Sequence, residues 1–494
     1  MLRSGGSAAD AAVATSAVLA VTTQHMCGMG GDLFALVHEP GVIAPAVLNA
    51  SGRAGSGADP DRLRRDGHRL MPPSGDVRAV TMPGCVDGWL ALHGRFGRLP
   101  LAAVLAPARG YATDGFPAAP ILSWVASMVA HLPGGSDFAA ATHPGAVVRR
   151  PGVARCLDAV VAAGRDGFYG GEFGAGLLEV GAGEFTTEDL ARDNADWVEP
   201  LGLDVWGRRL WTVPPNSQGY LTLAGAWIAA GLALPADTED PLWAHFTVEA
   251  ARQAAYDRVE VLHEGADGPS LLDEGRLGPR RAEVRADRAA DLGDGYGPGG
   301  TISLCVVDTD RMGVSLIQSN AGGFGANIAE PSTGVFLQNR GIGFSLEPGH
   351  PAEYRPGRRP PHTLAPALVT APDGRLDAVL GTMGGDSQPQ ILLQLLARVL
   401  GAGESIGAAV AAPRWALSNA GGGGGFSTWA ERGRVQVELE PAAPPGWSPG
   451  LTERGHRVRV TDGNYGHAHM IAVRADHLEG ASDPRALSGA AAAY

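Results

Sequence analysis

The sequence lacks most of the short motifs that reveal a function at once. No CxxC pair occurs, and no cysteine spacing is typical of a metal site. Buried free thiols are therefore expected at Cys27, Cys85, Cys156 and Cys305. GxSxG occurs as GESIG, 403–407, and as GWSPG, 446–450, but neither directly follows a predicted strand, and no GxGxxG lies between a strand and a helix. These patterns disfavour a serine hydrolase and a nucleotide-binding protein.

Basic charge is also scarce. The chain has 39 Lys and Arg against 52 Asp and Glu, which gives a formal net charge of −13. An acidic chain without a basic block is a poor candidate for binding nucleic acid or an anionic membrane. The short cluster Arg355, Arg358 and Arg359 is interpreted as a local site or a solvated turn.

Membrane and export signals are missing as well. The apolar stretch 8–21 is shorter than about 20 residues and contains Asp10, so it should not span a membrane. Residues 1–6 lack the basic-then-apolar pattern of a signal peptide, which predicts a cytoplasmic enzyme. The abrupt start leaves open that the natural N-terminus is longer.

Two histidines are the only hint of a metal site. His467 and His469 are two residues apart, so both lie on one face of a predicted strand. No cluster supplies a third ligand, and a metal site normally needs at least three. We therefore expect neither a metal nor a cofactor.

The chain does contain enough apolar material for a large core, since 45% of its 494 residues are hydrophobic. The region from about 100 to 290 is expected to be mostly helical. The predicted helices are 7–21, 89–96, 101–111, 241–262 and 389–400. The predicted strands are 33–38, 47–49, 302–307, 313–318, 335–337, 377–380, 435–440 and 457–461.

Residues 291–300 differ from the rest of the chain, because five of the ten are glycine and one is proline. Such a composition predicts an exposed, flexible loop. The strands 302–307 and 313–318 follow at once and are predicted to form a hairpin. The loop either links two domains or lies within one packed core. The pentaglycine 421–425 predicts a second surface loop.

Thr301 follows this loop directly and is a candidate nucleophile. A threonine hydroxyl is weak and needs a base. The α-amine of an N-terminal residue, with an ordinary pKa near 8, can act as that base. Cleavage before Thr301 would create this pair, and Gly300 offers little steric hindrance to the attack. The alternative is that Thr301 is only the first residue of a strand, where threonine is common.

Several segments in one collinear order resemble the γ-glutamyltransferase family of N-terminal-nucleophile hydrolases. The segment GGTISLCVVDTDRMGVSLIQS, 299–319, resembles the nucleophile hairpin of that family. The other matching segments are GGSAADAAVA (5–14) with GMGGDLFALV (28–37), MPGCVDGW (82–89), RRPPHTLAPALV (358–369), GTMGGDSQPQILLQLLARVL (381–400) leading to AAPRW (411–415), and GNYGHAHMI (463–471). Any one of them would be weak, but together they cover nearly the whole chain.

The resemblance implies a four-layer αββα sandwich of the N-terminal-nucleophile hydrolase type, within the α+β class. It implies a proenzyme cleaved between Gly300 and Thr301 into a large chain 1–300 and a small chain 301–494, intertwined in one core. Thr301 aligns with the catalytic threonine, and Ser319 with a hydroxyl that hydrogen-bonds the catalytic amine. Gly384 and Gly385 align with the glycine pair whose N–H groups form the oxyanion hole.

Substrate contacts follow from the same alignment. Arg53 aligns with the family arginine that binds the substrate carboxylate, which a guanidinium can grip with two parallel hydrogen bonds. His362 and Thr363 stand where the family has a pair of serines. The residues that hold the glutamyl amine in γ-glutamyl enzymes, an Asn, an acidic or amide residue and an Asp, are replaced here by Ala321, Arg340 and Gly343.

These replacements predict a change of substrate. A cation at Arg340 should repel an ammonium group and attract an anion. Asn320 or Asn327 could compensate for the lost amine contacts. The pattern resembles a branch of the family that includes cephalosporin acylases and oxamate amidohydrolase, and also family members of 4-alkylproline antibiotic pathways.

The sequence thus predicts an autoprocessing hydrolase that cleaves an amide or activated acyl bond of a small acidic substrate through an acyl-enzyme on Thr301. Three alternatives stay open. The protein could be a true γ-glutamyltransferase or glutathione hydrolase, a C–C bond hydrolase that removes an oxalyl group, or an uncleaved scaffold. A heterodimer of processed chains is expected, and further dimerisation is left open.

Overall fold

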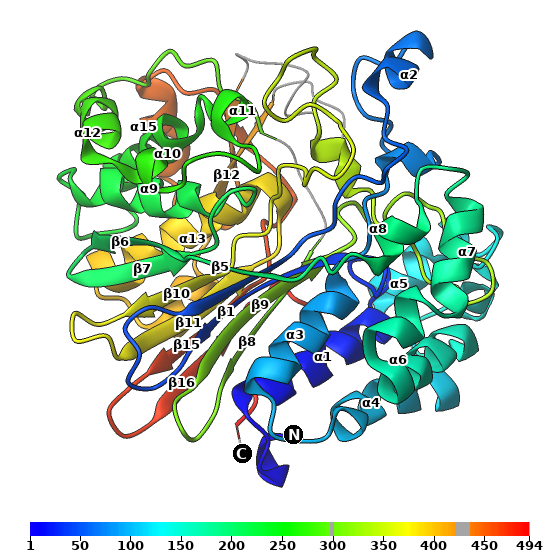
Figure 1. The fold of residues 1–494 in the computed structure, drawn as a ribbon. Coiled ribbons are helices and arrows are strands. Elements are labelled where there is room, and N and C mark those ends of the chain that lie inside the picture. Colours follow the sequence, from blue (N-terminus) through cyan, green and yellow to red (C-terminus); the bar gives the residue numbers. More distant parts are fainter. Residues whose placement is uncertain (297–300, 420–434, 494) are drawn as a thin grey trace.

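Two β-sheets lie at the centre of the computed structural model, which describes residues 1–296, 301–419 and 435–493 (Figure 1). The first sheet has the strand order β5–β2–β1–β9–β8 and is antiparallel throughout. Its strands are β5 (Asp196–Val198), β2 (Ala46–Ala50), β1 (Asp32–His38), β9 (Gly313–Ser319) and β8 (Ile302–Val307). The mixture of helices and sheets confirms the predicted α+β class.

The second sheet has six antiparallel strands in the order β16–β15–β11–β10–β7–β6. They are β16 (Leu478–Ser482), β15 (Ala468–Val473), β11 (Leu376–Thr382), β10 (Ala367–Thr370), β7 (Arg208–Thr212) and β6 (Leu201–Val205). Strand β11 contacts β8 and β9 of the first sheet. Between the sheets lies an apolar cluster to which both contribute, including Phe34, Ile317, Leu368 and Val379.

Two groups of helices flank the sheets, one on each side in Figure 1. The group beside the five-stranded sheet comprises α1 (Ala8–Thr22), α3 (Cys85–Phe96), α4 (Leu101–Asp114), α6 (Pro151–Tyr169) and α7 (Glu172–Val180). The group beside the six-stranded sheet comprises α9 (Tyr220–Ala230), α10 (Pro241–Ala255), α12 (Glu274–Ala282), α13 (Gln388–Leu396) and α15 (Trp447–Glu453). In the part of the chain that the structure describes, no helix combines the length and the apolar character needed to cross a membrane.

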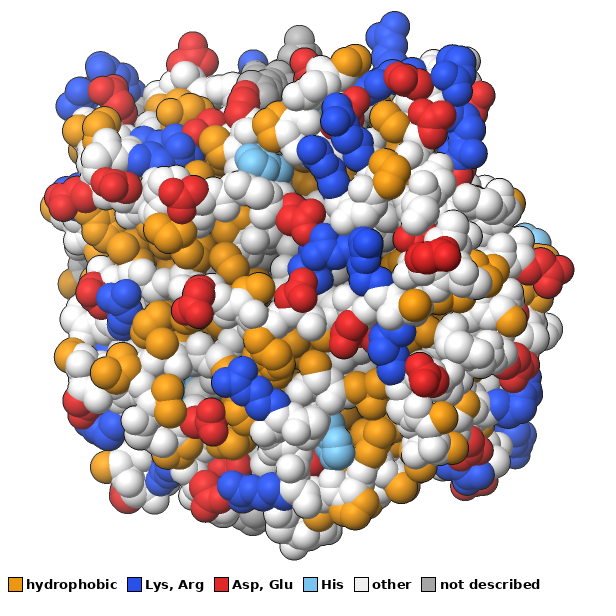
Figure 2. All heavy atoms as spheres, viewed as in Figure 1, with side chains coloured by type: hydrophobic (Ala, Val, Ile, Leu, Met, Phe, Trp, Pro, Cys, Tyr) orange, Lys and Arg blue, Asp and Glu red, His pale blue; other side chains and the backbone are white. Residues whose placement is uncertain are grey.

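Shorter elements complete the fold. The remaining helices are α2 (Pro60–Arg65), α5 (Pro120–Val125), α8 (Thr187–Ala191), α11 (Arg258–Val261) and α14 (Ile406–Ala411). A three-stranded sheet contains β12 (Trp415–Asn419), β13 (Val435–Leu439) and β14 (Val458–Val460), and a two-stranded pair contains β3 (Phe116–Pro117) and β4 (Val147–Val148). On the face shown in Figure 2, the described acidic and basic side chains are interspersed.

Helix α1 shows how the sequence determines an element that packs on the β8–β9 hairpin. Its N-terminus is closed by a capping box, in which Ser7 Oγ accepts from Asp10 N at 3.2 Å and Asp10 Oδ2 accepts from Ser7 N at 2.9 Å. This exchange satisfies two N–H groups that a helix start leaves unpaired. The small alanine side chains let α1 contact both β8 and β9. The helix predicted at 7–21 is therefore confirmed.

Four expectations about the elements need correction. The helix predicted over 241–262 is interrupted after Ala255, where Asp257 binds Arg276 and Arg280 of α12 instead of continuing a straight helix. The region 100–290 is mostly helical, as expected, but it also contains β5, β6 and β7, which were not predicted. Residues 335–337 form no named strand, only an isolated bridge from Ala329 to Phe336.

The fourth correction concerns the glycine loop. Within residues 291–296, Asp291 and Gly293 are exposed as predicted, but Asp294 is 1% exposed and Tyr296 is 3% exposed, so the segment is only partly the exposed loop that its composition predicts. The reason is a set of polar contacts to α10, described below. Residues 297–300 and the pentaglycine 421–425 lie outside the described residues. All four cysteines are free thiols, as expected, with Cys305 only partly buried.

Candidate active site

Thr301 and Ser319 lie together at one end of the five-stranded sheet. Ile302 of β8 pairs with Gln318 of β9, so the same register places Thr301 opposite Ser319. The Thr301 hydroxyl donates to Ser319 Oγ at 3.4 Å, and each residue is 1% exposed. Ser319 Oγ also accepts from Ala321 N at 2.8 Å. The hairpin thus brings the predicted nucleophile and its partner hydroxyl side by side.

A buried carboxylate lies on the next strand of the sheet, at the same end as Thr301 and Ser319. Asp32, the first residue of β1, pairs with Ser319 of β9 and is fully buried. It accepts hydrogen bonds from Gly52 N at 2.8 Å, Gln338 Nε2 at 2.8 Å and His362 Nε2 at 3.0 Å. A charge in the interior requires such partners. Asp32 therefore connects three separate loops to the end of the sheet that carries Thr301.

Asp32 is not among the site residues predicted from the sequence, although the glycines before it carry a signal. A Cβ atom on Gly30 would lie 2.0 Å from Phe336 O, and one on Gly31 would lie 2.4 Å from Ser319 O. Only glycine fits at such distances. A tight glycine cluster that ends in an acidic residue at the start of a strand could have indicated this position.

His362 is a neutral hydrogen-bonding group in this site. Burial, together with the nearby Arg340 guanidinium, lowers its pKa to about 4. At neutral pH the ring is therefore uncharged, with Nε2 donating to Asp32 and Nδ1 accepting from Leu364 N at 3.2 Å. The neighbouring Thr363 is 5% exposed, and its hydroxyl has no hydrogen-bond partner among the residues that the structure describes.

Arg340 is a buried cation that interacts electrostatically with Asp32 and Asp386. It begins a 3₁₀ turn, η6 (Arg340–Gly343), and is 1% exposed. Burial lowers its pKa to about 10, while Asp32 and Asp386 act in the opposite direction. The guanidinium therefore keeps its positive charge at neutral pH.

Gly343 and Ala321, the two other replaced positions, offer no polar side chain. A Cβ atom on Gly343 would lie 2.4 Å from Pro361 O, so a side chain has no room there. Ala321 is 1% exposed and has a φ of 75°, a conformation that is uncommon for residues other than glycine. Asn320 uses its amide nitrogen to donate to Gln24 O at 3.0 Å. Asn327 has a φ of 55° in the loop beyond.

Arg53 lies next to the site but its guanidinium is engaged elsewhere. Its backbone carbonyl accepts from Met82 N, adjacent to the Gly52 N–H that binds Asp32. Its side chain forms ion pairs with Glu264 and Asp196, the latter at 3.4 Å, and donates to Gly357 O at 3.1 Å. A substrate carboxylate at Arg53 would have to compete with these groups.

The predicted oxyanion glycines form a sharp turn at the end of β11. Gly384 has a φ of 137° and Gly385 a φ of 59°, both in the region that glycine adopts without strain. The turn then enters α13. Within β11, a Cβ atom on Gly381 would lie 2.2 Å from the Oγ of Ser303, two residues after Thr301. This close approach brings the end of β11 beside the beginning of β8.

A glutamine and an arginine that the sequence analysis did not assign to the site hold this turn. Gln218 Nε2 donates to Gly385 O at 2.9 Å and to Thr363 O at 3.0 Å. Its Oε1 accepts from Arg258 Nη1 at 2.8 Å, and Arg258 forms an ion pair with Asp386 at 2.9 Å. One amide therefore fixes both the glycine turn and the 362–363 segment.

The described residues include no group of three or more His, Cys, Asp and Glu that could hold a metal ion. The chemistry available is that of a buried hydroxyl, a glycine turn, a neutral histidine and a buried cation. All of these groups lie after position 300, whereas Asp32 and Gln218, which hold His362 and the glycine turn, come from the chain before it.

The chain belongs to the γ-glutamyltranspeptidase family. Its residues 1–493 match the sequence profile of that family, which is described as Gamma-glutamyltranspeptidase. The protein is therefore an enzyme of this family, as the collinear segments predicted.

Individual relatives are similar over their whole length. The oxamate amidohydrolase proenzyme of Klebsiella pneumoniae is 36% identical over 521 residues, covering 100% of this chain and 95% of that protein. The glutathione hydrolase-like YwrD proenzyme of Bacillus subtilis is 33% identical, covering 98% of this chain and 94% of that protein. The crystal structure of cephalosporin acylase from Bacillus halodurans has a TM-score of 0.87 and 32% identity, covering 98% of this chain and 91% of that one.

The contacts of Gln218 predict the effect of Gln218→Glu. Glutamate keeps an acceptor for Arg258 but loses both donors to Gly385 O and Thr363 O. Loss of one oxyanion-hole donor costs about 10²–10³ in rate. We expect kcat to fall by about tenfold to a hundredfold with a smaller change in KM, because the turn is displaced and not deleted.

Steady-state kinetics of amide hydrolysis on the fully processed protein checks this expectation. Gln436→Glu is the matched control, since Gln436 is partly exposed on β13 and donates to Ser418 and Glu438. An unchanged kcat in Gln218→Glu would show that this amide does not position the turn.

Proposed function

We propose that this protein is a proenzyme that cleaves itself between Gly300 and Thr301 and then uses Thr301 as an N-terminal nucleophile. The observation that carries the proposal is the pairing of Thr301 with Ser319, beside the Gly384–Gly385 turn. Membership of the γ-glutamyltranspeptidase family supports it, as do relatives named as proenzymes.

The proposal includes a four-layer αββα sandwich of the N-terminal-nucleophile hydrolase type. The contacts of β11 with β8 and β9, and the two helix groups, are consistent with this arrangement. Residues 1–300 would form a large chain and residues 301–494 a small chain. Both chains would contribute strands to each of the two large sheets.

Self-cleavage requires no group outside the chain except water. The Thr301 hydroxyl attacks the Gly300 carbonyl, and the acyl group moves from nitrogen to oxygen. Water then hydrolyses the ester, which leaves a carboxylate on Gly300 and a free α-amine on Thr301.

Catalysis repeats the attack on a substrate. The Thr301 Oγ forms a bond to the substrate carbonyl while its proton passes to the α-amine. The N–H groups of Gly384 and Gly385 stabilise the oxyanion. The carbon–nitrogen bond breaks as the proton passes to the leaving amine, and water hydrolyses the acyl-enzyme to the acid and free Thr301.

We infer that the substrate is a small acidic acyl amide without a γ-glutamyl amine. The backbone at Gly343 leaves no room for the acidic side chain that γ-glutamyl enzymes use to hold that amine. The charge of Arg340 favours an anionic group, and His362 stays neutral beside it. Oxamate fits this description, and a relative is named for its hydrolysis. Thr363 and Arg53 remain candidate contacts.

Replacing the nucleophile tests the processing. Thr301→Ala should remain a single 494-residue chain without activity, because it has no hydroxyl for either step, whereas the wild type should give chains 1–300 and 301–494. Intact-mass measurement of the purified proteins separates these outcomes. Thr309→Ala, an exposed threonine in the turn of the same hairpin, should be cleaved like the wild type. Cleavage of Thr301→Ala would refute the assignment.

Arg340→Gln tests the acidic substrate. Hydrogen bonds to charged groups contribute about 1.5–3 kcal/mol, so kcat/KM for oxamate and glutaryl-p-nitroanilide should fall by roughly 10- to 150-fold. The wild type should also prefer these compounds to γ-glutamyl-p-nitroanilide.

Arg375→Gln is the matched control, because Arg375 is 75% exposed in the turn between β10 and β11. A clear wild-type preference for the γ-glutamyl compound, or equal kinetics for Arg340→Gln and Arg375→Gln, would contradict the proposed specificity.

A further inference from the structure

The chain just before the proposed cleavage site is fastened to α10 by a buried ion pair. Arg252 of α10 donates from Nε to Asp294 Oδ2 at 3.0 Å and from Nη2 to Asp294 Oδ1 at 3.2 Å. Arg252 is 7% exposed and Asp294 is 1% exposed. Two parallel hydrogen bonds between charged groups hold a carboxylate in one orientation. The position of Asp294 relative to α10 is thereby fixed.

Contacts on both sides of Asp294 extend this attachment. Glu249 accepts from Arg252 Nη1 at 2.9 Å and from Ala290 N at 3.0 Å, and Ala290 O accepts from Arg252 Nη1 at 3.0 Å. The Tyr296 hydroxyl donates to Asp294 Oδ2 at 3.2 Å, and Tyr296 N donates to Asn419 Oδ1 at 3.1 Å. The segment is therefore held at residues 290, 294 and 296.

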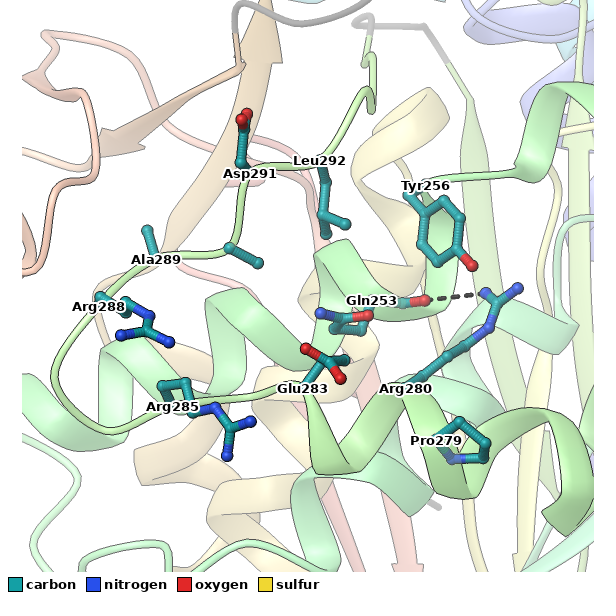
Figure 3. Close-up of a pocket in the computed structure, with 11 residues that line it drawn as sticks. Gln253, Tyr256, Pro279, Arg280, Glu283, Arg285, Arg288, Ala289, Asp291 and Leu292 are labelled. Atoms are coloured by element: carbon teal, nitrogen blue, oxygen red, sulfur yellow. Dashed lines mark hydrogen bonds between the residues drawn. The ribbon is translucent and has the colours of Figure 1, made fainter.

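Around residues 289–292, close packing of side chains contributes little to the attachment. Beneath residues 289–292 lies a pocket of about 540 Å³, bounded by this segment and by residues of α10 and α12. Figure 3 shows Ala289, Asp291 and Leu292 on one side of the pocket and Gln253 and Arg280 on the other. Because a hollow takes the place of packed side chains there, the hydrogen bonds to Arg252 and Glu249 carry much of the attachment.

We propose that the Arg252–Asp294 pair positions the chain for self-cleavage, an inference that rests on the proposed function. Thr301 is held from the other side by strand β8. Tyr296 precedes Thr301 by five residues, so the extended chain between them spans at most about 18 Å. Because Tyr296 and Thr301 are both held and lie this close together in the chain, the segment between them has fewer accessible conformations. The Thr301 hydroxyl can then reach the Gly300 carbonyl in a larger fraction of them.

Arg252 is on this account a positioning residue for maturation and takes no part in acyl transfer to the substrate. Without the ion pair, Tyr296 loses its hydroxyl contact with Asp294 but keeps the hydrogen bond from its N–H to Asn419, and Ala290 stays bound to Glu249. The chain before Thr301 is then held less firmly and adopts more conformations, so the attack becomes less frequent.

A pulse-chase measurement of cell-free synthesised full-length protein tests the inference, with conversion to two chains followed on gels. Asp294→Asn should lengthen the half-time of cleavage by about tenfold, since small misplacements of reacting groups cost up to about 100-fold. Tyr296→Phe should lengthen it less, because it loses only the hydroxyl contact. Asp291→Asn, an exposed carboxylate of the same segment, is the matched control and should match the wild type.

Two further measurements separate positioning from a loss of folding. The same substitutions in the uncleaved Thr301→Ala protein should leave it folded at the assay temperature, because Arg252 keeps its ion pair with Glu249. The kcat of cleaved Asp294→Asn, per processed site, should equal that of the wild type.

Wild-type half-times in folded Asp294→Asn and Tyr296→Phe would overturn the inference. Equal slowing in Asp291→Asn would overturn it too. Failure of the proposed function gives a different result, because the wild type itself would then stay uncleaved or Thr301→Ala would be cleaved.

Discussion

A buried negative charge at Asp32 is the constraint on which the candidate site depends. The carboxylate begins β1, has no exposure to solvent, and is satisfied by hydrogen bonds from three loops. Hydrogen bonds to charged groups contribute about 1.5–3 kcal/mol, so each loop is held in place. Burial keeps His362 neutral, whereas Asp32 and Asp386 favour the charged form of Arg340. The positions of the loops around Thr301 therefore depend on the Asp32 carboxylate.

Much of the fold and the position of Thr301 beside Ser319 could be predicted because the signals are local. The capping box at Ser7, the apolar hairpin after position 301 and the glycine pair at 384–385 each depend on a few neighbouring residues. The family resemblance added the order of the segments, and family membership is confirmed over residues 1–493. The pairing of Thr301 with Ser319 then follows from the register of one hairpin.

The remaining parts could not be predicted because they depend on contacts between distant positions. Gln218 holds residues 145 and 167 positions away, and nothing near it in sequence indicates this. Asp294 lies in a glycine-rich segment that is typical of an exposed loop, yet Arg252 buries it. The strands β6 and β7 lack a strong apolar pattern, and their place in the sheet is set by pairing with β10. The ion pairs of Arg53 could not be predicted for the same reason, since their partners come from distant segments.

The strand order has a consequence for the stability of the mature enzyme. In the five-stranded sheet, β1 from the N-terminal part pairs with β9 from the C-terminal part, and in the other sheet β7 pairs with β10. Cutting the chain at position 300 would leave these pairings intact but would remove the covalent link between their partners. Refolding would then require the association of two separate chains, so the apparent melting temperature would rise with protein concentration. The uncut precursor, as a single chain, would show no such dependence.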